Sequence, residues 1–73
     1  MTRYIDLSRY WTEDSGLSIQ KAHEQTKIAK QTLSVARRGF LDRAQIDTIF
    51  KLLELASELA GKKLSLEDIT TEK

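Results

Sequence analysis

The chain has 73 residues, and its twelve Lys and Arg residues against eleven Asp and Glu residues give a formal net charge of +1. A chain of this length has too little core to divide, so residues 1–73 are expected to form a single domain. The absence of cysteine excludes a disulfide framework, and one histidine without cysteine excludes a zinc-finger site. Taken as a whole, the near-neutral charge argues against nucleic-acid binding.

Several classes of protein are not expected from this sequence. The uninterrupted apolar stretches are too short for a membrane span, and the N-terminal residues lack the apolar run of a secretory signal. We therefore expect a cytoplasmic protein with no membrane partner. The lone His23 has no nucleophile signature nearby, and the three glycines are too far apart to form a phosphate-binding loop. No enzymatic activity, metal or cofactor is expected.

The first predicted element is a helix over Thr2–Ser15. Tyr4, Leu7 and Trp11 recur there at i, i+3 and i+7, which is the spacing of one apolar helix face. Gly16 follows and is expected to end this helix, since glycine readily adopts the left-handed conformation of a helix C-cap. We expect the apolar stripe to pack in the core.

Two short helices are predicted next. Ser18 is a suitable N-cap for a helix that ends near Thr26, and a second helix is predicted over Lys30–Arg38, ended by Gly39. Only a short turn separates the two helices. Such a pair within a helical domain is typical of a helix-turn-helix DNA-binding unit, here over about residues 18–38.

The second of these helices carries a polar face that could contact DNA. On a helical wheel Leu33 and Ala36 occupy one narrow apolar arc. The opposite arc holds the polar residues Lys30, Gln31, Ser34 and Arg38, with Val35 at its edge. Gln, Lys and Ser can donate hydrogen bonds to base edges, and Val can contact a thymine methyl group. The alternative is a solvated helix face with no ligand, because such residues also serve solubility alone.

The charge is unevenly distributed along the chain. Residues 18–43 contain six basic and two acidic residues and carry +4, whereas residues 1–17 carry −1 and residues 44–73 carry −2. The positive charge is therefore concentrated in the two short helices and the loop after them. A basic face on an otherwise acidic body is expected where a protein meets phosphates on one side.

The last predicted elements are a long helix over Arg43–Ala60, ended by Gly61, and a short turn of helix that begins at Ser65. Ser65 and Asp68 have the spacing of a capping box. With the preceding segments, these elements predict an all-α fold, a compact bundle of about five helices that contains the helix-turn-helix.

From Leu17 onward the sequence resembles the helix-turn-helix family of the lambda-repressor and Cro type, also called the xenobiotic-response-element family. The resemblance is carried by Ser18, Ala22-His23, Lys27-Ile28-Ala29, Thr32-Leu33-Ser34 and Gly39, and the segment 64–69 is similar to the closing helix of the family. Two positions depart from the family pattern, because His23 replaces a small residue and Lys27 replaces the turn glycine. The resemblance implies a lambda-repressor-like fold.

The resemblance also implies a function and a set of contact residues. The chain is expected to bind a double-stranded DNA operator as a small transcriptional regulator, acting as a repressor. The implied base-reading residues are Lys30, Gln31, Ser34 and Val35. The expected phosphate contacts are Lys27, Arg37, Arg38 and Arg43.

The long helix has an apolar arc of about 220°, wider than a one-sided surface helix needs. Residues expected to fill the core are Ile46, Ile49, Phe50, Leu53, Ala56 and Ala60. This assignment leaves Leu52, Leu55 and Leu59. Either Trp11 or the tail covers these three leucines, or they form a homodimer interface. The alternative function is a helical protein-interaction module, such as an antitoxin or adaptor, that binds a partner protein through helix 43–60.

Overall fold

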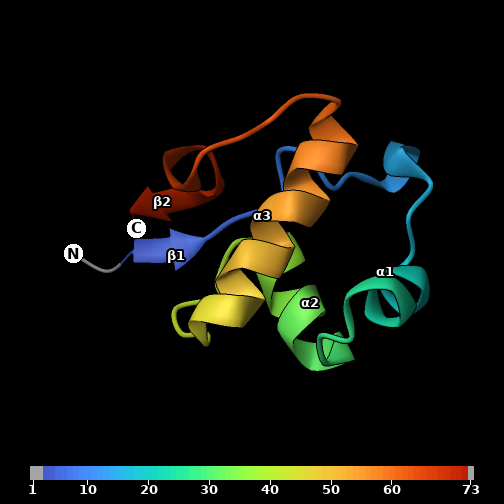
Figure 1. Ribbon diagram of the computed structural model, residues 1–73, viewed down its shortest axis with the longest axis horizontal. Coiled ribbons are helices and arrows are strands. Elements are labelled where there is room, and N and C mark those ends of the chain that lie inside the picture. The colour runs from blue at the N-terminus through green and yellow to red at the C-terminus, as the bar shows by residue number, and fades with distance from the viewer. Residues whose placement is uncertain (1–2, 73) are drawn as a thin grey trace.

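The computed structural model describes residues 3–72, which form three α-helices and a two-stranded antiparallel sheet (Figure 1). In chain order the elements are β1 (Arg3–Ile5), a 3₁₀ turn (Glu13–Ser15), α1 (Ile19–Thr26), α2 (Lys30–Arg38), α3 (Ile46–Ala60), a 3₁₀ turn (Leu66–Ile69) and β2 (Thr70–Glu72). The predicted all-α bundle of about five helices is therefore wrong.

The N-terminal segment is where the prediction fails most clearly. Instead of a helix over Thr2–Ser15, of which Thr2 lies outside the described residues, the chain forms β1 and pairs with β2 from Arg3↔Glu72 to Ile5↔Thr70. The next backbone donors also bond to distant segments, since the N–H of Asp6 donates to the Ile69 carbonyl at 2.7 Å. These long-range bonds satisfy the backbone without a helix.

Besides the 3₁₀ turn Glu13–Ser15, one hydrogen-bonded turn at residues 7–11 remains of the expected first helix. The N–H of Trp11 donates to the carbonyl of Leu7 at 2.7 Å, and both side chains are buried. The N–H of Leu7 donates to the carbonyl of Ala36 at 3.0 Å, which ties this turn to the end of α2. The apolar spacing therefore identified two core residues, although the segment does not form a continuous helix.

The two predicted short helices are present. Ser18 caps α1 through its Oγ, which accepts the N–H of Lys21 at 3.1 Å, and α2 has the predicted bounds. The helix α3 ends at Gly61 as predicted but begins at Ile46 rather than Arg43, because Gln45 is in an extended conformation. The helices α1 and α2 pack against each other, and α3 crosses in front of α2 in the view of Figure 1.

The capping box in the tail is also present. The backbone N–H and the hydroxyl of Ser65 donate to Asp68 Oδ2 at 2.8 and 3.1 Å. The hydrogen bonds from Ser65 lower the pKa of the Asp68 carboxyl, because they favour its charged form. The turn then leads directly into β2.

The buried side chains form one cluster drawn from all parts of the chain. Its largest fully buried members are Trp11, Leu7, Leu33, Leu52 and Ile69. Two residues expected in this core are exposed instead, since Ile46 is 71% and Phe50 54% exposed. The helix α3 directs Leu52, Leu55 and Ala56 inward, and the arc that contains Ile46 and Phe50 faces outward.

No helix within residues 3–72 is long and apolar enough to cross a membrane.

Candidate functional site

The solvent-facing side of α2 is the candidate site. Leu33 and Ala36 are fully buried and anchor the helix, as the wheel predicts. Lys30, Gln31 and Arg38 are exposed. The helix contains no acidic residue, and its nine residues span about 13.5 Å. One side of α2 therefore holds it in the core while the other presents donor groups to solvent.

The exposed donor groups of Lys30, Gln31 and Arg38 make no ion pair or side-chain hydrogen bond within residues 3–72. Within residues 3–72 no ion pair involves Lys30, Arg37 or Arg38; the one observed joins Arg3 to Glu72. The side chains of Lys30 and Gln31 likewise make no hydrogen bond to another described residue. Their donors are directed to solvent, so a ligand could engage them without breaking an internal contact.

Three of the predicted contact residues, Ser34, Val35 and Arg37, are partly buried rather than exposed. Val35 is partly buried and packs against the hydrophobic core, so only part of its side chain is available. Arg37 is also partly buried, and its Cζ lies 5.4 Å from the centroid of the Trp11 ring. A cation held over an aromatic face in this way has a restricted orientation. The contact could not be predicted from the sequence, because Trp11 and Arg37 are 26 positions apart and no local pattern indicates which face of α2 meets Trp11.

The turn between α1 and α2 sets the angle at which α2 is presented. His23 is partly buried, and its Nδ1 donates to the carbonyl of Ile28 at 2.7 Å. Thr26 Oγ1 donates to the carbonyl of Ala22 at 2.7 Å and accepts a hydrogen bond from the N–H of Ile28 at 3.2 Å. These bonds hold the short connection closed. His23 thus serves the packing of the turn, and its presence in place of a small residue is compatible with the two-helix unit.

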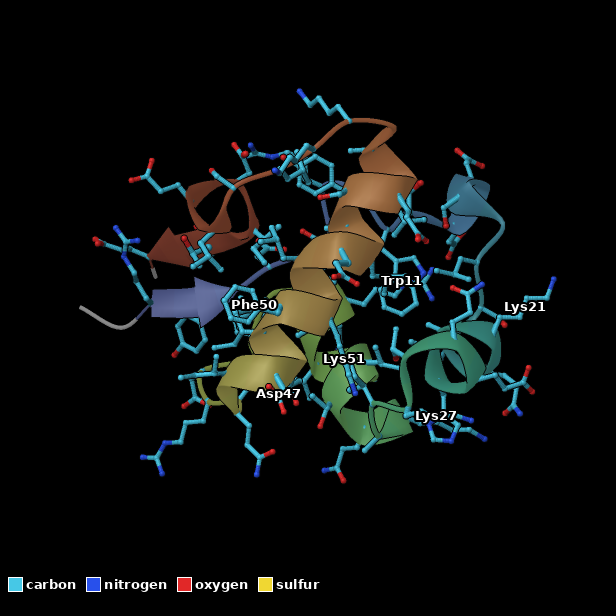
Figure 2. The ribbon with its side chains drawn as sticks, viewed as in Figure 1. Trp11, Lys21, Lys27, Asp47, Phe50 and Lys51 are labelled. Carbon is cyan, nitrogen blue, oxygen red and sulfur yellow. The ribbon has the colours of Figure 1, made fainter. Side chains whose placement is uncertain are left out.

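Lys27 occupies a left-handed position in this turn, with φ of 63°, and it is the sole non-glycine residue with positive φ among residues 3–72. Its side chain projects into solvent at the lower edge of the molecule in Figure 2. The sequence comparison with the resembled family places Lys27 where that family has a turn glycine. The positive φ of Lys27 shows that a glycine would suit this position.

We expect Lys27→Gly to stabilise the domain by about 0.5–1 kcal/mol, because relief of the left-handed strain exceeds the added entropy of the unfolded chain. Urea unfolding followed by circular dichroism measures this gain. Lys27→Ala is the matched control, because it removes the same charge but keeps a Cβ atom. Equal stability of the Gly and Ala variants would contradict the interpretation.

A depression lies between residues 11–13, the start of α1 and the C-terminal half of α2. It is lined by Trp11, Thr12, Glu13, Ile19, Ser34, Arg37 and Arg38. Ile19, the first residue of α1, contributes an apolar side chain to this lining. The Arg37 and Arg38 guanidinium groups and the Glu13 carboxylate all border the depression, so its lining carries both signs of charge.

The remaining predicted phosphate contact, Arg43, is exposed in the loop between α2 and α3. Lys27 precedes α2 and Arg43 follows its C-cap, so basic side chains flank the helix at both ends. Groups of this kind can neutralise phosphates on either side of a groove while the residues of α2 face the base edges.

The three leucines proposed for a homodimer interface are differently placed. Leu52 and Leu55 are 0% and 3% exposed and belong to the same buried cluster as Trp11, Leu64 and Ile69. Leu59 is partly buried against that cluster. The core of the domain covers these residues, so they offer little surface to a second chain.

Comparison with protein-family models, with curated proteins and with solved structures gave no match. In the part of the chain that the structure describes, no group of three His, Cys, Asp or Glu residues could hold a metal ion.

Proposed function

We propose that the protein binds double-stranded DNA and reads sequence by inserting α2 into the major groove, as a small transcriptional regulator that represses by occupying an operator. The observation that carries this proposal is the solvent face of α2, where Lys30 and Gln31 present donors with no partner inside residues 3–72. The helix–turn–helix arrangement of α1 and α2 supports it, since this arrangement can project a short helix into a groove about 12 Å wide.

The residues divide into two roles. Lys30 and Gln31, in the first turn of α2, are assigned to base edges, with Ser34 beside them and the exposed part of Val35 available to a thymine methyl group. The phosphate contacts are assigned to Lys27, Arg37, Arg38 and Arg43. If four phosphates are neutralised per subunit, log affinity falls against log salt with a slope of about −3.6.

The proposal is tested by selecting bound sequences from a random DNA pool and then measuring variants on the selected site. Gln31→Ala is expected to cost about 1–3 kcal/mol and to relax specificity at one base position, because it removes a two-point contact to a base. Arg38→Ala is expected to weaken all sequences alike and to reduce the salt slope by about 1. Fluorescence anisotropy at several salt concentrations measures both effects.

Matched controls come from the same chain. Gln25→Ala removes the same side chain from the exposed surface of α1, and Lys63→Ala removes a positive charge from the loop after α3. Both variants should bind as the parent does. Absence of salt-dependent DNA binding by the parent, or unchanged binding by Lys30→Ala and Gln31→Ala, would refute the proposal.

A second candidate function is a helical protein-interaction module that binds a partner through α3. The exposed Ile46 and Phe50 favour it, because large apolar side chains on a helix surface are typical of protein contacts. This function predicts that Phe50→Glu abolishes partner binding while variants of α2 leave it intact. The DNA-binding function predicts the reverse sensitivity for DNA.

A further inference from the structure

The indole ring of Trp11 is fixed by its own hydrogen bond and by those of the turn that carries it. Trp11 is buried, and its Nε1 donates to the carbonyl of Leu17 at 2.8 Å. Its backbone N–H donates to the carbonyl of Leu7, whose own N–H donates to the carbonyl of Ala36 at 3.0 Å. Ala36 directly precedes Arg37 in α2. The turn that carries Trp11 is therefore bonded to the end of α2 that carries Arg37, and Figure 2 shows Trp11 beside α3, on the side of the molecule where α1 lies.

Arg37 contacts this ring through its charge and not through hydrogen bonds. Its Cζ lies over the Trp11 ring, 5.4 Å from the centroid, and its side chain is partly buried. Within residues 3–72 its guanidinium makes no ion pair and no side-chain hydrogen bond. The attraction between a cation and an aromatic face requires no N–H donor. The guanidinium is thus held in place while its N–H groups remain available to a ligand.

The neighbouring charges leave Arg37 accessible and provide a matched comparison. Glu13 borders the same depression, but its carboxylate makes no ion pair with Arg37 or Arg38 in the described part of the chain. Arg38 is the next residue of α2, is exposed, and has no aromatic ring beneath its guanidinium among residues 3–72. Two adjacent arginines of α2 therefore differ in one respect, since one is oriented by a buried ring and the other extends freely into solvent.

We propose that Trp11 is a positioning residue for DNA binding, because its ring holds the Arg37 guanidinium in the orientation in which it binds a backbone phosphate. This inference rests on the proposed function. Ordering a long side chain on binding lowers affinity, and a side chain that is already in its bound orientation avoids this loss. The planar guanidinium binds a phosphate through two parallel N–H groups, so its orientation matters. Trp11 raises the affinity for all sequences alike without touching DNA, since phosphate contacts do not read bases.

A double-mutant cycle on the DNA affinity tests this role. Trp11→Leu keeps an apolar side chain in the core but removes the aromatic face. Alone, it is expected to weaken binding about two- to tenfold, because Arg37 must then be ordered on binding. Combined with Arg37→Ala, it should cause no further loss, since the group that it positions is absent. Combined with Arg38→Ala, the matched control, it should weaken binding as much as it does alone. Circular dichroism establishes that each variant is folded under the conditions of the binding measurement.

The fluorescence of Trp11 gives a second test that needs no change of the core. Trp11 is the one tryptophan of the chain, so its emission reports on the charge beside its ring. Addition of saturating duplex DNA is expected to change the emission of the parent and of Arg38→Ala, because a phosphate pairs with the Arg37 guanidinium. The same addition should leave the emission of Arg37→Ala unchanged. This test stands if Trp11→Leu does not fold.

Two results would overturn the inference while DNA binding itself stands. One is an equal loss of affinity from folded Trp11→Leu with and without Arg37, since Trp11 would then act through the stability of the core alone. The other is an emission that DNA leaves unchanged in the parent or changes equally in Arg37→Ala. Failure of the proposed function is separately visible, because a parent without salt-dependent DNA binding overturns that function and this inference together.

Discussion

A Trp11→Ala variant is expected to lose about 3–5 kcal/mol of unfolding free energy, the cost of removing a large buried aromatic side chain. Trp11 is 1% exposed and is the largest fully buried side chain of the core. A domain of this size has about 4–11 kcal/mol to lose. The variant should therefore lose a large share of the stability of the domain and unfold at a clearly lower urea concentration. Urea unfolding followed by circular dichroism measures the loss. Tryptophan fluorescence cannot be used, because Trp11 is the one tryptophan of the chain and the variant lacks it.

Trp11→Phe is the matched variant. It keeps an aromatic ring in the core but loses the hydrogen bond from Trp11 Nε1 to the carbonyl of Leu17, which is 2.8 Å long. We expect a loss well below that of the alanine variant, with a contribution of about 1–3 kcal/mol from the unpaired carbonyl. An alanine variant that unfolds within about 1 kcal/mol of the parent would show that Trp11 is not the centre of the core.

A Gly39→Ala variant is expected to lose about 2–4 kcal/mol, from left-handed strain together with a displaced carboxylate. Gly39 caps α2 with φ of 87°, and an added Cβ would lie 2.7 Å from Asp6 Cγ. The carboxylate cannot withdraw freely, because Asp6 Oδ1 accepts the N–H of Ser8 at 2.8 Å. Thermal and urea unfolding measure the effect.

Gly61→Ala separates the two causes. Gly61 caps α3 with φ of 71°, but an added Cβ there meets nothing within 4 Å. This control should therefore show the strain alone, about 1–2 kcal/mol. In the double variant Asp6→Ala/Gly39→Ala the added Cβ no longer meets a carboxylate. The stability lost by the double variant should therefore be smaller than the sum of the losses of the two single variants. Equal losses for Gly39→Ala and Gly61→Ala would contradict a steric role for Asp6.

The N-terminal segment illustrates the limit of apolar spacing as a guide to secondary structure. Tyr4, Leu7 and Trp11 fit a helix face, and Leu7 and Trp11 are indeed buried, yet Tyr4 lies in β1. The strand that pairs with β1 lies nearly seventy residues away in the sequence. The residues of that strand, Thr70–Glu72, show no local pattern that predicts a strand. Strand pairing of this kind depends on which chain ends meet, which local periodicity does not encode.

The candidate site was more predictable than the fold. The wheel of α2 needs only its own residues and the rule that its apolar arc is buried, and Leu33 and Ala36 are buried as expected. The glycine that ends α2 is also a local feature of the sequence. The contact of Arg37 with Trp11 was not predictable, because it depends on how the N-terminal turn packs against α2.

The sequence by itself determined the short helices, their glycine stops, the polar face of α2 and the concentration of positive charge in residues 18–43. Each of these follows from neighbours along the chain. The tertiary structure decided which part of the wide apolar arc of α3 is buried. Leu52 and Leu55 pack in a cluster with Trp11 and Ile69, while Ile46 and Phe50 remain exposed. An arc wider than one contact face can be buried in more than one way, and only the segments that pack on it settle the choice.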